Sequence, residues 1–322
     1  MLRTTKSKQN YTLAHLSSTK RSLPGQIWDF ILHLRWHYQV FILSGGYLIS
    51  GLFVAEPAWN NYLWQFVNVH LLLFGGATAY NSYFDKDEGP IGGLTHPPKM
   101  KTWMHPASLL FQFGGLGWAI YTQNWIYSLI YVISLLLFWL YSTPHFRWKG
   151  DPVKSIWAIA LSTGTNSFLM GYLAAGGDPV LLQPWLAAIG VALILVSLYP
   201  VSQLFQLEDD RMRGDQTFAL IYGNEGIRRF YLGTFQSGAL LTSATILTFS
   251  MPLAVVFLLT SQLTGFYIQG VIKGLEGTEE EYNYVMKIKY FTSFSFIGFI
   301  IAAYVIRYFV TEPIFGFPIF HY

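Results

Sequence analysis

Long apolar runs separated by short polar segments make up most of the chain. A run of about 20 apolar residues is long enough to cross the hydrocarbon core of a bilayer as a helix. The pattern predicts nine such helices, with the third and fourth separated only by the letters TQN and therefore forming a tight helical hairpin. They lie near residues 38–56, 62–84, 106–122, 125–143, 155–175, 182–205, 229–249, 252–272 and 290–310. We therefore expect an all-α membrane protein.

The composition supports this fold class and narrows the chemistry. Of the 322 residues, 52% are hydrophobic and 11% are charged, whereas an ordinary soluble domain has about 25% charged residues. The chain contains no cysteine. Disulfides, thiolate metal sites and a cysteine nucleophile are therefore excluded.

Positive charges gather on one side of the predicted membrane. If the N-terminus is cytoplasmic, nine spans put five segments on the cytoplasmic side. They are the N-terminal tail and the loops at 85–105, 144–154, 206–228 and 273–289. Of the 20 Lys and Arg residues, only Arg307 in the last span lies away from these segments and their edges, as the positive-inside rule predicts. We expect residues 1–37 to form a basic cytoplasmic tail and residues 38–322 to form the membrane domain. The C-terminus would lie on the opposite side.

Two of the predicted spans end on the cytoplasmic side in dense polar motifs. The second span runs into NSYFDKDEGPIGG from Asn81, and the sixth runs into QLEDDRMRGD from Gln206. Because the two spans are four apart, we interpret the chain as two four-helix halves in parallel orientation, followed by a ninth helix. This arrangement places both motifs on the same face of the membrane.

The spacing within each motif suits oxygen ligands for a metal ion. Side chains four residues apart share one face of a helix, which pairs Asn81 with Asp85 and Gln206 with Asp210. Oxygen ligands without Cys or His favour a hard cation, and Mg²⁺ typically takes one or two carboxylates together with substrate phosphates. Basic residues on the same side would bind the anion. The candidate metal ligands are Asn81, Asp85, Glu88, Gln206, Asp209 and Asp210, and the candidate diphosphate-binding residues are Arg147, Lys149 and Arg211.

Each of these residues also has a simpler explanation. A carboxylate at a helix end is usually only solvated, and Arg and Lys in inside loops set membrane topology. The simpler explanation accounts poorly for two acidic clusters on one side, at matching ends of two halves. A functional site therefore remains a hypothesis beside the solvated-end interpretation.

The two motifs and the segment between the halves resemble the UbiA superfamily of intramembrane prenyltransferases. NSYFDKDEGPIGG and SQLFQLEDDRMRGDQTFALIYG are similar to the two Asp-rich motifs of that family. YSTPHFRWK resembles its YS-x-P-P-x-R-x-K segment, in which Arg147 and Lys149 would contact the diphosphate. With the nine-helix layout, the resemblance extends over most of the chain.

The resemblance departs from the family pattern at two positions. The first family motif, N-x-x-x-D-x-x-x-D, matches Asn81 and Asp85, but its third position falls on Gly89. We hypothesise that Glu88 or Asp87 substitutes there. The second motif, D-x-x-x-D, has Gln206 in its first position, and an amide oxygen is an uncharged and weaker metal ligand than a carboxylate.

The resemblance implies a Mg²⁺-dependent transfer of a prenyl group from an allylic diphosphate to an aromatic or lipophilic acceptor. Asp85 and Asp210 are the expected catalytic residues, with Asp210 taking the proton of the acceptor. The bilayer is the expected surrounding, and no feature indicates a nucleic-acid partner. Three alternatives remain open: a terpene cyclase on the same scaffold, a membrane transporter, and a membrane scaffold without catalytic activity.

Overall fold

The computed structural model describes residues 22–86, 89–309 and 320, and within these residues it contains helices and no β-strand. The expected all-α fold class is therefore confirmed. Residues 1–21 of the predicted tail lie outside the described residues, as do two candidate metal ligands, Asp87 and Glu88.

The first four predicted spans correspond to a series of helices that are partly interrupted. Span 1 is broken into three short elements that follow a separate helix within the predicted tail, and span 2 contains a π-helical turn. The elements are α2 (Leu23–Leu34), α3 (Trp36–Phe41), α4 (Gly45–Ser50), η1 (Gly51–Phe53), α5 (Trp59–Val67), η2 (Asn68–Phe74), α6 (Gly75–Asp85), α7 (Met104–Thr122) and α8 (Trp125–Ser142). The predicted hairpin is confirmed, because Asn124 caps α8 by accepting the backbone N–H of Tyr127 only two residues after α7 ends.

The remaining spans follow the same pattern, with a second π-helical turn in span 5. In spans 6, 7 and 9 the helical structure extends beyond the predicted apolar run. The elements are η3 (Trp148–Gly150), α9 (Pro152–Ile159), η4 (Ala160–Thr165), α10 (Asn166–Ala174), α11 (Leu182–Ser197), α12 (Tyr199–Gln203), η5 (Leu204–Gln206), α13 (Leu207–Arg213), α14 (Phe218–Leu247), α15 (Met251–Lys273) and α16 (Glu279–Phe309).

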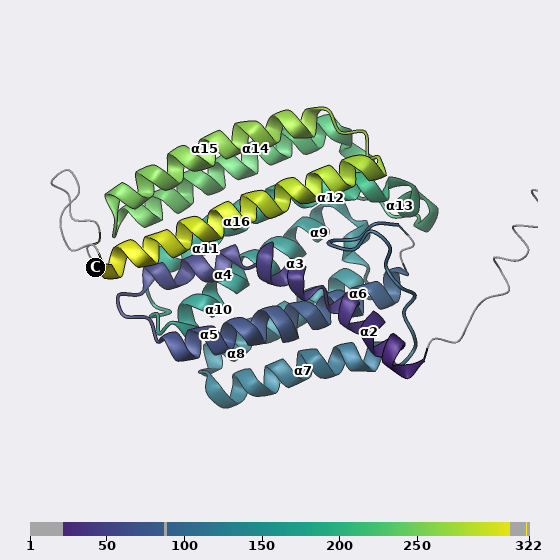
Figure 1. The fold of residues 1–322 in the computed structure, drawn as a ribbon, viewed down its shortest axis with the longest axis horizontal. Helices are drawn as coiled ribbons and strands as arrows, with labels where there is room; N and C mark the ends of the chain where they lie inside the picture. Colours follow the sequence, from purple (N-terminus) through teal and green to yellow (C-terminus); the bar gives the residue numbers. More distant parts are fainter. Residues whose placement is uncertain (1–21, 87–88, 310–319, 321–322) are drawn as a thin grey trace, which may run out of the picture.

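The long helices run side by side along the longest axis of the molecule (Figure 1). Helices α14 and α15 pack together on one side with α11 beneath them, while α7 and α8 lie on the other side. The largest buried apolar cluster joins α4, α5, η2, α8, α10 and α11 in the middle of the bundle. A second cluster joins α12, α14 and α15, and a third joins α2, α6 and α7.

Four helical stretches in the described part of the chain are long and apolar enough to cross a membrane. They are Trp125–Ser142, Leu182–Arg213, Met251–Lys273 and Glu280–Phe309. The outer faces of such helices expose large apolar side chains, with Trp125 at 73%, Leu263 at 73% and Phe291 at 72% exposure, as lipid-facing surfaces do. The count of nine spans, and the division into two four-helix halves, stay predictions.

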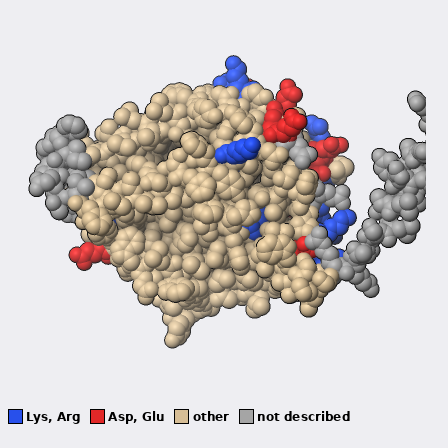
Figure 2. Space-filling model, in the orientation of Figure 1, with Lys and Arg blue, Asp and Glu red and all other residues tan. Residues whose placement is uncertain are grey.

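Charged side chains gather mainly at one end of the visible face, near α13 and the start of α16 (Figure 2). Most of the remaining visible surface has neither Lys and Arg nor Asp and Glu. That this end faces the cytoplasm stays a prediction of the positive-inside rule. This distribution places the polar motifs at the end of the bundle rather than in its middle.

Three segments differ from the predicted layout. The second polar motif, predicted as loop, is largely helical in α13, because its charged residues favour a helix that Gly214 ends in a left-handed conformation (φ 75°). Helix α14 begins within the loop predicted at 206–228 and kinks at Gly223 (φ 60°). Helix α2 lies within the predicted tail and packs on α6.

Candidate active site

The first polar motif lies at the end of α6, where Asn81 and Asp85 share one face of a continuous helix. Asn81 donates from Nδ2 to Ser142 Oγ over 3.2 Å, at the end of α8. Asp85 is buried and stands at the C-terminal end of its helix, where the helix dipole disfavours a negative charge. A stable carboxylate at this position requires nearby cations.

The segment after α8 supplies these cations. Lys149 Nζ lies 2.7 Å from Asp85 Oδ2, and Arg147 Nη1 lies 3.5 Å from Asp85 Oδ1. Lys149 is itself buried, so this ion pair is shielded from water. The structure therefore brings together Asp85, Arg147 and Lys149, which the sequence had assigned to one site.

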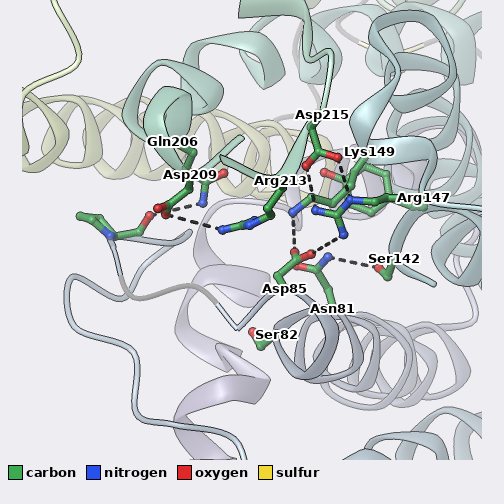
Figure 3. Close-up of polar contacts among 12 residues, drawn as sticks. Asn81, Ser82, Asp85, Ser142, Arg147, Lys149, Gln206, Asp209, Arg213 and Asp215 are labelled. Carbon is green, nitrogen blue, oxygen red and sulfur yellow. Dashed lines mark hydrogen bonds and ion pairs between the residues drawn. The ribbon is translucent and has the colours of Figure 1, made fainter. Parts of the chain in front are cut away.

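A residue outside the predicted set completes this cluster. Asp215 accepts hydrogen bonds from Arg147 Nε and Nη2, both at 2.7 Å, and is almost fully buried. Figure 3 shows Arg147 and Lys149 between Asp85 on one side and Asp215 on the other. These hydrogen bonds raise the pKa of the Arg147 guanidinium above its already high usual value, so the side chain remains a cation throughout the physiological range.

The second polar motif is divided between two places. Asp210 is buried and close enough to Lys149 and Asp215 to interact with both electrostatically. Gln206 donates instead to the carbonyl of Pro90 at 3.5 Å, and Asp209 pairs with Arg213 at 3.6 Å. Figure 3 shows these last contacts apart from the Asp85 cluster.

The separation of Gln206 from Asp210 has a local cause. The expected shared face requires one continuous helix, but Gln206 ends the 3₁₀ turn η5 with φ −127° and ψ 11°, and α13 begins after it. The four-residue spacing therefore does not place these side chains together. Arg211 is exposed on α13, and among the described residues it forms no ion pair with either cluster.

Two hydroxyl contacts made by tyrosines lie near the charged cluster. The hydroxyls of Tyr141 and Tyr199 are 3.1 Å apart, and those of Tyr80 and Thr143 are 2.9 Å apart. Tyr141 interacts electrostatically with Asp85 and Asp210. The charged groups are therefore bordered by tyrosines from α6, α8 and α12, of which Tyr80 is buried and Tyr141 and Tyr199 are half-buried.

A further basic residue contacts the first motif at Ser82. Arg35 adopts a left-handed conformation (φ 49°) between α2 and α3, and donates to Ser82 Oγ over 2.6 Å. It is buried. The sequence identified Arg35 only as an inside positive charge, because no pattern links position 35 to position 82.

These features define an all-helical protein with apolar spans and a buried site of mixed charge at one end. The sequence profile of the UbiA prenyltransferase family matches residues 44–294. Because this match covers most of the chain and includes both polar motifs, the chain belongs to the UbiA prenyltransferase family. No curated protein matches the sequence.

Solved structures of UbiA homologues share the fold. The chain is similar to a UbiA homologue from Archaeoglobus fulgidus bound to DMAPP and Mg²⁺, and to the same homologue bound to GPP and Mg²⁺. Each comparison has a TM-score of 0.67 at 16% identity, covering 85% of this chain and 98% of that one. A structure described for digeranylgeranylglyceryl phosphate synthase in membranes matches with a TM-score of 0.58 at 20% identity, covering 86% of this chain and 98% of that one.

Proposed function

We propose that the protein transfers a prenyl group from an allylic isoprenoid diphosphate to a lipophilic or aromatic acceptor, with Mg²⁺ as cofactor. The observation that carries the proposal is the meeting of Asp85, Arg147 and Lys149 at one end of an apolar helical bundle. The family and the DMAPP, GPP and Mg²⁺ complexes of the related A. fulgidus protein support it.

The residues of the site fit a hard cation bound together with a diphosphate. Asp85 Oδ1 is buried and has no hydrogen-bond partner among the described residues, with Arg147 only at ion-pair distance. No group of three His, Cys, Asp or Glu side chains in the described part could hold a metal without other ligands. Asp85 with Asn81 and Asp210 would therefore hold Mg²⁺ in company with phosphate oxygens, which is how Mg²⁺ is commonly bound.

The chemistry begins with heterolysis of the allylic C–O bond, whose electron pair leaves with the diphosphate. Mg²⁺, when bound, would neutralise charge on that leaving group. Arg147 and Lys149 would stabilise the same charge through hydrogen bonds in a site largely shielded from water. The positive charge left on the prenyl carbon is delocalised, and the half-buried rings of Tyr141 and Tyr199 border the site.

Transfer is completed when the acceptor forms a bond to the prenyl carbon and loses a proton. Asp210 is the proposed base, because it is a buried carboxylate beside Lys149 and Asp215. The remaining assignments of site residues stay predictions. They concern Gln206, Asp209 and Arg211, which lie apart from the Asp85 cluster, and Asp87 and Glu88, which lie outside the described residues.

The first prediction tests the reaction. Purified protein in nanodiscs should release diphosphate from DMAPP or GPP only when Mg²⁺ and a membrane extract containing acceptors are both present. Mass spectrometry of the lipids should detect an acceptor whose mass has increased by one prenyl unit. Mg²⁺-dependent release without extract, accompanied by a hydrocarbon or alcohol, would support the cyclase in place of the transferase. Absence of release under every condition would overturn the enzymatic proposal.

A second prediction tests the orientation, in which the charged end faces the cytoplasm. The chain has no native cysteine, so a single introduced thiol reports one position. Met212 on α13 is 74% exposed, and Val180 between α10 and α11 is 86% exposed. Helix α13 and the turn between α10 and α11 lie at opposite ends of the bundle (Figure 1). With a membrane-impermeant maleimide on intact cells, we expect labelling of the Val180→Cys variant and labelling of Met212→Cys only after permeabilisation. The reverse pattern would contradict the proposed topology.

A further inference from the structure

Arg147 is held by one carboxylate and directed toward another. Asp215 occupies its Nε and Nη2 atoms, each at 2.7 Å, while Nη1 lies 3.5 Å from Asp85 Oδ1. The guanidinium is planar and has five donors in a fixed arrangement. A two-point contact on one edge therefore fixes the direction of the remaining donors.

The backbone around Asp215 is arranged to make this contact. The N–H of Asp215 binds the carbonyl of Asp210, and the N–H of Gln216 binds the carbonyl of Gly150 at 2.9 Å. A Cβ atom at Gly150 would lie only 2.5 Å from Asp215 Oδ1. The segment after α13 thus joins the loop after α8, and the absence of a side chain at position 150 leaves room for the carboxylate.

We propose that Asp215 is a positioning residue that orients Arg147, so that its Nη1 edge faces the diphosphate beside Asp85. This inference rests on the proposed function and extends it to a residue that acts through Arg147 rather than on the substrate. Arg147 occupies a left-handed conformation (φ 39°), which a residue without glycine's freedom adopts only when its surroundings hold it. The paired contact with Asp215 contributes to that restraint.

The sign of the expected effect separates positioning from simple electrostatics. Asp215 is an anion close to the proposed binding place of another anion. By Coulomb repulsion alone, removing its charge would strengthen diphosphate binding. If Asp215 mainly orients Arg147, its removal instead weakens binding and slows turnover.

The test combines two single variants and their double variant in nanodiscs. Asp215→Ala should lower kcat/KM for GPP by about 10- to 100-fold, the usual range for a residue that orients a direct ligand. In the Arg147→Ala background, the same substitution should cause no further loss, because Arg147 is the group through which Asp215 acts. Equal, additive losses in the two backgrounds would overturn the proposal.

Binding supplies a readout that does not depend on turnover. Calorimetric titration with inorganic diphosphate in the presence of Mg²⁺ should show weaker binding to Asp215→Ala than to the wild-type protein, whereas tighter binding would contradict positioning. The Mg²⁺ concentration that gives half-maximal activity should be unchanged, and an increase would instead make Asp215 a metal ligand. If the wild-type protein neither binds diphosphate nor releases it, the proposed function fails, whatever Asp215 does.

A variant that leaves Asp215 chemically intact provides an independent check. Gly150→Ala should reproduce the loss seen with Asp215→Ala, because the new methyl group would displace the carboxylate from Arg147. Gly117→Ala is the matched control, since in the described part of the chain the added methyl group on α7 would meet no atom within 4 Å beyond its chain neighbours and its own helix backbone. Wild-type activity in Gly150→Ala would show that the Asp215 contact does not position Arg147.

Discussion

Replacement of Asp85 by Asn should lower prenyl transfer on the order of 100-fold or more, because it removes the charge that pairs with Lys149 and would bind the metal. The isosteric amide keeps the shape of the side chain but binds a divalent cation more weakly. We expect this variant to fold, because the buried Lys149 ammonium group still has the Asp210 carboxylate nearby to balance its charge. The measurements are diphosphate release in nanodiscs at saturating Mg²⁺ and the amount of protein recovered from membranes.

Glu208→Gln is the matched control for this variant. Glu208 belongs to the second acidic motif but is exposed on α13 and lies outside the predicted ligand set. The control should therefore keep wild-type activity. An Asp85→Asn variant with wild-type activity would remove the first motif from the reaction, and the simpler interpretation of a solvated helix end would then apply.

The sequence predicted most helices because each span combines a long apolar run with a polar or glycine-containing break. The hairpin between α7 and α8 was predicted correctly, since Asn124 is both a loop residue and an N-cap. The extension of α16 back to Glu279 was not predicted. Its first turns are polar, and a search for apolar runs detects only the part of a helix that faces lipid.

The candidate site was predictable where contacts follow from local spacing and charge. Asn81 and Asp85 lie on one uninterrupted helix, and the basic loop after α8 supplies Arg147 and Lys149. The contact between Arg147 and Asp215 joins residues 68 positions apart, and no sequence period indicates it. The sequence hints at this contact only weakly, in that Asp215 follows Gly214 directly after the acidic motif. The geometry of that turn depends on the fold and cannot be derived from the local sequence.

The departure at Gln206 illustrates the same limit. An i, i+4 pair predicts a shared face only if the backbone stays α-helical, and the 3₁₀ turn η5 breaks this condition. Gln206 consequently contacts the carbonyl of Pro90. Of the two residues of this pair, Asp210 is the one that lies near the Asp85 cluster, where it interacts electrostatically with Lys149 and Asp215.

Substitution of Lys149 by Met should reduce turnover about 100-fold and should also destabilise the protein, and the two losses have different causes. The Lys149 and Asp85 side chains are only 9% and 2% exposed. Loss of Lys149 leaves the buried Asp85 carboxylate with only the longer ion pair to Arg147, at 3.5 Å, and this weaker compensation should cost up to about 3 kcal/mol. The loss of activity instead reflects the missing ammonium group, which would bind the departing diphosphate.

Combining Lys149→Met with Asp85→Asn separates these causes, because the double variant contains neither buried charge of the pair. Its melting temperature in detergent should recover toward that of the wild-type protein, since the stability losses of interacting residues are not additive. Its diphosphate release should remain as low as in the single variants, because both the anion-binding cation and the metal-binding carboxylate are absent. Recovery of activity along with stability would mean that the Lys149–Asp85 pair only holds the loop after α8 in place, and that the diphosphate binds elsewhere.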